Sequence, residues 1–192
     1  MAGAPRAAVT DLDGPAFNAL FDTFQVSVVR LETLPAYAVG GAEAVRLEAF
    51  RRGTARPLRS VRTDPWLARI AVSTVTGGKT WRRVRVFDDP PTDYQRYQVD
   101  SYREAQAVGD EVVIASRAAV GTMGLDVWVF DAGLSGARAV VMHYRPDGAI
   151  DRRELVTDAA AVAALAAAAE RVARHAVPLN VWLAEADVRA GA

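Results

Sequence analysis

The chain has 192 residues, of which 51% are hydrophobic and 24% are charged. This length and composition suit one domain with a substantial core. The sequence holds no cysteine and only two histidines, His143 and His175. These counts exclude disulfides, thiolate metal sites and a cysteine nucleophile, and they leave too few imidazoles for a histidine-based metal site. The composition therefore predicts neither a metal nor a cofactor.

The 23 basic and 23 acidic residues cancel overall but are unevenly distributed. Residues 44–86 hold 10 Arg and 1 Lys against Glu48 and Asp64, a balance of 11 − 2 = +9, and the remainder holds 12 basic and 21 acidic residues, or −9. A positive middle between negative flanks suggests an anionic partner. Arginine outnumbers lysine 22 to 1. Part of that excess reflects a GC-rich genome, so the charge alone does not identify the partner.

No run of about 18 apolar residues is present, so no membrane span is expected. Residues 1–8 carry one arginine with no apolar core after it, unlike a secretory signal. We therefore expect a soluble cytoplasmic protein with no membrane contact.

The first third of the chain is expected to begin with a disordered segment, residues 1–15, which is rich in Ala, Gly, Pro and Asp. The apolar spacing of residues 17–24 predicts a short amphipathic helix. The β-branched residues of 25–31 indicate a strand. A second helix is predicted at residues 41–50, and an arginine-rich loop follows at residues 54–63.

A hairpin and a capped helix are expected in the middle of the chain. Residues 66–75 are predicted to be a strand, a two-glycine turn follows, and residues 79–87 are predicted to be the partner strand. A double proline ends that second strand. Thr92 and Gln95 then have the spacing of a capping box, which predicts a helix over residues 92–107.

The second half of the chain is expected to hold four strands and two helices. The strands are predicted at residues 111–116, 125–130, 138–144 and 149–155, and the helices at residues 158–175 and 178–188. Several hairpins and few β-α-β crossovers favour the α+β class. We therefore expect a mainly antiparallel sheet with helices packed on it, in a single domain of residues 16–192.

The strand predicted at residues 79–87 carries the first candidate site. Because side chains alternate along a strand, Lys79, Trp81, Arg83 and Arg85 are expected on one face. Two arginines beside a tryptophan suit a phosphate or carboxylate, with a ring of the ligand stacked on the aromatic side chain. The alternative is a solvated sheet face whose arginines pair with neighbouring acids.

Two tyrosines of the predicted helix 92–107 form a second candidate. Tyr94, Tyr97 and Ser101 fall on one stripe of the helix. Tyrosine hydroxyls near the arginine strand can orient a ligand or donate a proton. The alternative is packing, in which the rings are buried against the sheet and the hydroxyls stay in water.

An acid and an aromatic residue share a face of the next strand. Asp126 and Trp128 are two residues apart, so they can bind a cationic ligand together, or Asp126 can pair with Arg83 or Arg85. The alternative is a structural ion pair of Asp126 in the core. His143 is a further candidate for proton transfer, and otherwise an ordinary surface or core histidine.

Several separated motifs together resemble a known family. They comprise Arg30-Leu31-Glu32-Thr33 with Tyr37, Pro65-Trp66-Leu67, Gly78-Lys79, Arg83-Val84-Arg85-Val86, Pro91 with Tyr94 and Tyr97, Gly109-Asp110-Glu111, and Asp126 with Trp128, Phe130 and Asp131. Over roughly residues 20–180 the chain resembles an actinobacterial domain family of unknown function, often encoded beside helix–turn–helix regulators. The resemblance implies regulators as genomic neighbours and implies no reaction.

These observations predict a regulatory or interaction domain that binds an anionic small molecule, a nucleic acid or an acidic protein partner. The predicted ligand-binding residues are Lys79, Trp81, Arg83, Arg85, Tyr94, Tyr97 and Trp128.

One alternative is a small enzyme acting on a nucleotide, RNA or an aminoacylated substrate. Arg83 and Arg85 would hold phosphate, and Tyr94, Asp126 or His143 would handle protons. Another alternative is self-association as a homodimer through exposed strand edges.

Overall fold

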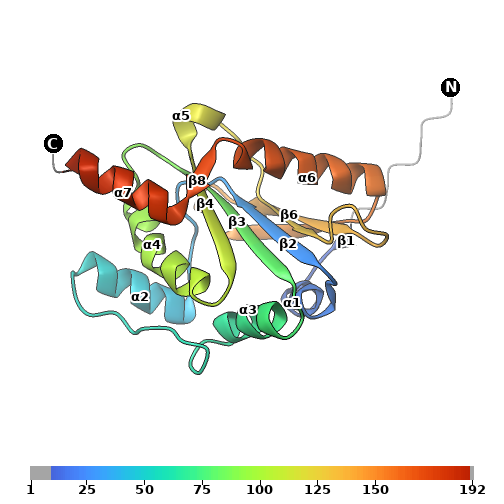
Figure 1. Ribbon diagram of the computed structural model, residues 1–192, viewed down its shortest axis with the longest axis horizontal. Helices are drawn as coiled ribbons and strands as arrows, with labels where there is room; N and C mark the ends of the chain where they lie inside the picture. Colours follow the sequence, from blue (N-terminus) through green and yellow to red (C-terminus); the bar gives the residue numbers. More distant parts are fainter. Residues whose placement is uncertain (1–9, 191–192) are drawn as a thin grey trace.

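An eight-stranded sheet runs through the molecule with helices on both faces (Figure 1). The computed structural model describes residues 10–190. In spatial order the strands are β1 (Thr10–Asp11), β7 (Ile150–Val156), β6 (Arg138–Tyr144), β5 (Val127–Phe130), β2 (Ser27–Glu32), β3 (Thr80–Phe87), β4 (Asp110–Ser116) and β8 (Ala176–Pro178). Only β2–β3 and β3–β4 pair in parallel; the other neighbours are antiparallel. The predicted α+β class with a mainly antiparallel sheet is confirmed.

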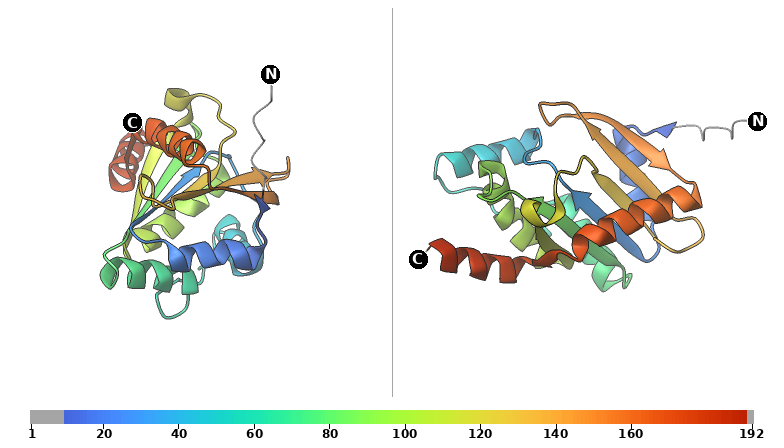
Figure 2. Two further views of the ribbon diagram at one scale, coloured as in Figure 1. Left: turned by 90° about the vertical axis from the view of Figure 1, so that its right-hand side faces the viewer. Right: turned by 90° about the horizontal axis from the view of Figure 1, so that it is seen from above.

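The helices form two layers, one on each face of the sheet. They are α1 (Gly14–Thr23), α2 (Gly41–Arg51), α3 (Pro65–Val75), α4 (Asp93–Gln106), α5 (Arg117–Val120), α6 (Ala159–Ala173) and α7 (Leu179–Ala190). Figure 2 shows α6 on one face and α1 and α3 on the opposite face. No helix of the described residues has both the length and the apolar character needed to cross a membrane.

The side chains of β3 alternate as predicted. Val84 and Val86 are buried with apolar residues of α6, whereas Trp81 packs with residues of α1 and α3. Arg85 is buried on the same face as Trp81, where its Nε donates to Gln98 of α4 at 3.0 Å. This face of β3 is therefore covered by helices and is not solvated, but Arg83 on it pairs with Glu32 and Asp110, as the alternative expected of its arginines.

The segment of residues 66–75 is a helix, so the predicted strand and hairpin are wrong. The Asp64 side chain caps α3 by accepting from the backbone N–H groups of Trp66 at 2.9 Å and Leu67 at 3.2 Å, and proline occupies the first turn. An acid cap followed by proline is a helix start signal, and it outweighs the β-branched residues of this segment. Leu67 and Ile70 are buried one turn apart. The two glycines therefore connect α3 to β3.

The N-terminal expectation is partly wrong. Residues 10–15 contain β1, whose Thr10 pairs with Leu155 of β7, and the start of α1. Asp13 caps α1 by accepting from the backbone N–H of Ala16 at 2.7 Å. The expectation of disorder for residues 1–9 lies outside the described residues.

The predicted capping box of α4 is confirmed. Thr92 Oγ1 accepts from the Gln95 N–H at 3.2 Å, and Gln95 Oε1 accepts from the Thr92 N–H at 2.9 Å. The reciprocal bonds satisfy donors at the start of the helix and fix its direction. Tyr94, Tyr97 and Tyr102 are buried on its inner side as a result.

Candidate functional site

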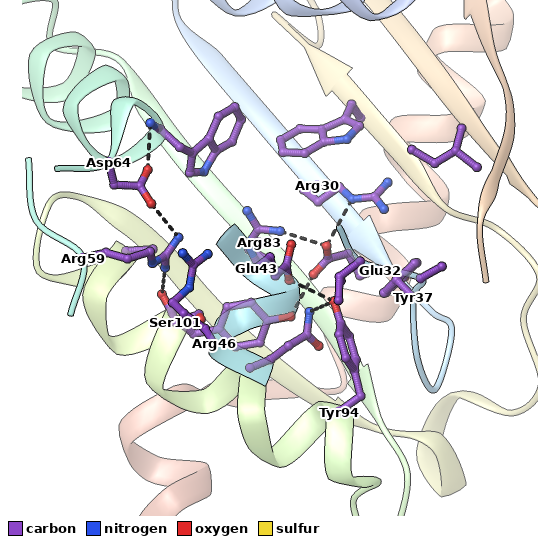
Figure 3. A pocket seen from close by; sticks show the side chains of 18 of the residues that line it. Arg30, Glu32, Tyr37, Glu43, Arg46, Arg59, Asp64, Arg83, Tyr94 and Ser101 are labelled. Atoms are coloured by element: carbon purple, nitrogen blue, oxygen red, sulfur yellow. Dashed lines mark hydrogen bonds and ion pairs between the residues drawn. The ribbon is translucent and has the colours of Figure 1, made fainter. Parts of the chain in front are cut away.

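A cavity of about 420 Å³ lies between the sheet and helices α2, α3 and α4 (Figure 3). Its walls include arginines, acids and aromatic side chains from elements far apart in the sequence. The strands contribute Arg30, Glu32, Arg83 and Trp128, α2 contributes Glu43 and Arg46, α3 contributes Trp66, and α4 contributes Tyr94, Gln98 and Tyr102.

Two arginines and a tryptophan stand side by side on the floor of the cavity. Arg30 of β2 is opposite Arg83 of β3 in the parallel pair and opposite Trp128 of β5 in the antiparallel pair. The Cζ atoms of Arg30 and Arg83 lie 5.2 and 5.7 Å from the Trp128 ring centroid. The ring face attracts both cations, but like charges on adjacent strands repel. This arrangement therefore needs an anion close by.

Glu32 supplies that anion. Its Oε1 accepts from Arg83 Nη1 at 2.9 Å and lies 3.5 Å from Arg30 Nε, and its Oε2 accepts from the Tyr102 hydroxyl at 2.9 Å. Burial by itself would raise the pKa of Glu32, but Arg83, Arg30 and Arg85 together lower that pKa to about 2. Glu32 is therefore ionised at neutral pH, and its charge is compensated by neighbouring protein side chains.

Asp126 forms a buried ion pair with Arg30. Its Oδ1 accepts from Arg30 Nη2 at 2.8 Å and from the Tyr37 hydroxyl at 2.5 Å, and its Oδ2 accepts from the N–H and hydroxyl of Thr33 at 3.1 and 2.9 Å. Burial alone would lower the pKa of the Arg30 guanidinium, but Asp126 and neighbouring groups raise it. Asp126 thus makes the structural ion pair foreseen as the alternative, with Arg30 in place of Arg83 or Arg85.

One guanidinium donor of Arg30 has no partner among the described residues. Arg30 is only 3% exposed, and its Nε forms the ion pair with Glu32, yet its Nη1 makes no hydrogen bond in this part of the chain. Arg83 beside it donates from Nε to Asp110 at 3.4 Å and from Nη1 to Glu32 at 2.9 Å. A buried donor without a partner is costly. Two adjacent arginines therefore line the cavity, and one buried donor of Arg30 is left without a hydrogen-bond partner among the described residues.

The opposite wall carries a second acid. The Tyr94 hydroxyl donates to Glu43 Oε1 at 3.4 Å and accepts from Gln98 Nε2 at 3.2 Å. Burial raises the pKa of both Glu43 and Tyr94. Arg46 lies one turn along α2 from Glu43, and its Nε is buried without a hydrogen bond among the described residues. Glu43 and Glu32 therefore share a cavity in contrasting environments.

The structure brings three of the predicted site residues, Arg83, Tyr94 and Trp128, together at this cavity. Arg85 lies in the core beneath it, where Nη1 donates to the Glu32 carbonyl at 3.3 Å. Tyr97 packs against α2 in a cluster with Tyr94.

The remaining predicted residues are placed elsewhere. Lys79 Nζ donates to the Phe24 carbonyl. Trp81 is buried, and its indole N–H donates to Ser73 Oγ at 2.7 Å. His143 Nε2 lies 2.8 Å from Glu154 Oε2, and His143 is not among the residues that line the cavity.

Sequence reasoning did not select Arg30, Glu32, Glu43 or Trp66. Arg30 and Glu32 were visible as two charges at alternate positions of an apolar strand, and both belong to the motif Arg30-Leu31-Glu32-Thr33. Of the residues that carry the family resemblance, several line this one cavity: Arg30, Glu32, Tyr37, Trp66, Arg83, Tyr94 and Trp128. The motifs are far apart in the sequence, and folding brings these residues of them together around one cavity.

The basic middle of the chain is partly neutralised by the acidic flanks, which pair with five of its eleven cations. The ion pairs join Arg56 to Asp100 and Glu104, Arg59 to Glu104, Arg69 to Asp22, Arg82 to Glu111 and Glu170, and Arg83 to Glu32 and Asp110. Folding thus brings basic residues of the middle segment into ion pairs with acidic residues of the flanks. No group of three or more His, Asp or Glu side chains within residues 10–190 is placed to hold a metal ion.

Fold and cavity together define an α+β domain with an arginine-lined pocket on its sheet. The model of the family described as "Domain of unknown function (DUF6879)" matches residues 15–184, and the chain belongs to this family. The predicted membership of a family of unknown function is thereby confirmed. A comparison with curated proteins gave no match.

Proposed function

We propose that this chain is a regulatory ligand-binding domain whose cavity receives the anionic group of a small molecule at Arg30 and Arg83. One observation carries the proposal: Arg30 is almost fully buried, yet Nη1 has no hydrogen-bond partner among the described residues. A carboxylate or phosphate bound beside Arg83 would supply an acceptor for this donor, since guanidinium groups match the geometry of these anions.

The aromatic side chains favour a ligand with a flat or apolar part. Trp128 lies under both arginines, and Trp66 packs edge-on to it with ring centroids 5.8 Å apart. Both rings line the cavity beside the cations. Pockets for small molecules commonly combine such apolar walls with a few fixed polar groups.

A nucleic acid or an acidic protein has less support as the partner. Binding of a polyanion requires many uncompensated cations on one face, whereas much of the basic zone is paired with acids. Among the ion-paired arginines, Arg56, Arg59 and Arg83 have largely buried side chains. The regulatory role itself, like the actinobacterial origin and the neighbouring regulators, is inferred from the family resemblance.

The enzyme alternative is also weaker. Of its three proton-transfer candidates, only Tyr94 lines the cavity, and burial raises the pKa of Tyr94, so the hydroxyl keeps its proton. Asp126 is held by four donors behind Arg30. His143 pairs with Glu154 instead.

Fluorescence titration tests the proposal, because Trp66 and Trp128 line the cavity. Benzoate, adenosine monophosphate and a mixed-sequence oligonucleotide are titrated against three proteins: the wild type, Arg83→Gln and Arg62→Gln. Arg62 is exposed in the same basic zone and serves as the matched control. We expect a saturable response to at least one small anion in the wild type and Arg62→Gln, and its loss in Arg83→Gln.

A second variant guards against misfolding. Arg83→Lys keeps the charge beside Glu32 but lacks the forked donors, so we expect it to be folded by circular dichroism and to bind at least about tenfold more weakly. Equal binding of small anions by Arg83→Lys and the wild type would overturn the proposal. The proposal would also be overturned if the wild type bound the oligonucleotide more tightly than the small anions and Arg62→Gln weakened that binding.

A further inference from the structure

Three acids line the cavity, Glu32, Glu43 and Asp64, and Asp64 is engaged by Arg59 and by the backbone at the start of α3. Glu32 accepts hydrogen bonds from Arg83 and Tyr102 and lies beside Arg30, so its charge is compensated within the protein. Within residues 10–190 the Glu43 carboxylate has one hydrogen bond, from the Tyr94 hydroxyl at 3.4 Å, and Arg46 and Arg59 act on it only through their charge. Glu43 is therefore the acid of this cavity with the fewest hydrogen bonds, which leaves carboxylate oxygens for a ligand.

Glu43 and the two arginines face a common space from opposite sides. Glu43 comes from α2 and Arg83 comes from the sheet, and Figure 3 shows their charged ends near Glu32, toward which Arg30 turns its Nε. A ligand that bridges the cavity therefore meets guanidinium groups at one end and a carboxylate at the other.

The charges around this space are close to balanced. Arg30 and Arg83 already have Asp126, Asp110 and Glu32 as ion-pair partners. An anion with no positive charge would add to this set of acids and would place another negative group in the cavity with Glu43. A ligand that carries both signs avoids that repulsion, because its cationic end pairs with Glu43.

We propose that the ligand is a zwitterion of the amino-acid type, with its carboxylate at Arg30 and Arg83 and its ammonium group at Glu43. This inference rests on the proposed function and narrows its ligand class. The side chain of such a ligand would lie against Trp66 and Trp128. Glu43 acts in this scheme as a specificity residue that distinguishes an amino acid from a simple carboxylate.

The test compares three ligands that differ by one group at a time. The standard L-amino acids are screened by thermal shift, and the strongest binder is measured by calorimetry beside its des-amino carboxylate and its decarboxylated amine. We expect removal of either charged group to weaken binding about tenfold or more, as the loss of one partner of a buried charge pair does.

Two variants of α2 assign the effect to Glu43. Glu43→Gln should reduce the preference for the amino acid over the des-amino carboxylate to less than about threefold. Glu48→Gln is the control, since Glu48 lies on the same helix, is exposed and pairs with Arg52. It should leave the preference unchanged.

The outcomes separate the two proposals. Simple carboxylates that bind through Arg83 as tightly as their amino acids would overturn the zwitterion and leave the anion pocket standing. Equal ligand preferences in Glu43→Gln and Glu48→Gln would also overturn it. If neither amino acids nor carboxylates bind, the anion pocket itself is wrong.

Discussion

Glu32→Gln removes the negative charge that lies between Arg30 and Arg83. The substitution keeps the size of the side chain but leaves two adjacent buried guanidinium groups without their shared anion. Glu32 is 7% exposed, so water does little to replace the lost charge. Breaking a buried ion pair from one side is strongly destabilising for this reason.

The magnitude follows from the pKa of Glu32. The fold lowers this pKa from its ordinary value of 4.5 to about 2, and each pH unit of such a change corresponds to about 1.4 kcal/mol. The ionised Glu32 therefore contributes about 3 kcal/mol to the free energy of unfolding. Because the folded pKa is the lower one, this contribution is complete above about pH 4.5 and is lost as the pH falls toward 2.

Urea denaturation at two pH values measures the effect. We expect Glu32→Gln to lower the free energy of unfolding by about 3 kcal/mol at pH 7 and by only about 1 kcal/mol at pH 3. Glu111→Gln is the matched control, because Glu111 is exposed where it pairs with Arg82 and should cost less than about 1 kcal/mol. A loss at Glu32 that is the same at both pH values would refute the reasoning.

Three further predictions concern the scaffold and use the same denaturation assay. Ile70→Ala leaves a cavity at a fully buried position and should lower the free energy of unfolding by about 2–5 kcal/mol. Val75→Ala, at an 85% exposed position of the same helix, should change it by less than about 0.5 kcal/mol. Similar losses in the two variants would contradict the packing of α3. Asp131→Ala removes the acceptor of three consecutive backbone N–H groups and should cost about 1–3 kcal/mol, and an unchanged midpoint would count against that role. Gly109→Ala adds a methyl group 2.8 Å from Thr74 at a φ of +108°, so a loss below about 1 kcal/mol would contradict the close approach.

Local signals predicted much of this fold. Thr92 and Gln95 formed the capping box because the bonds involve residues three apart. The alternation of β3 placed Trp81 and Val84 on opposite faces because that pattern follows from strand geometry. At α3 the cap signal and the β-branched composition disagreed, and the Asp64 cap prevailed.

The site was only partly predictable because it depends on strand order. Arg83 was selected from its own strand, but its neighbours Arg30 and Trp128 are set by the order β5-β2-β3, which no local pattern encodes. Glu43 lies on a helix whose docking onto α4 is likewise non-local. The basic middle and acidic flanks of the sequence were expected to indicate an anionic partner, but several of these charges pair with one another in the folded chain.

The most direct test of the central claim is a crystal structure of the protein grown in sodium bromide, with the anomalous signal used to locate the anions. Bromide is a monatomic anion with no hydrogen-bond donor, so it reports only sites that attract negative charge. We predict an ordered bromide site in the cavity within hydrogen-bonding distance of Arg30 and Arg83. Bromide found only at exposed arginines such as Arg51 and Arg62, with none at Arg30 and Arg83, would contradict the account.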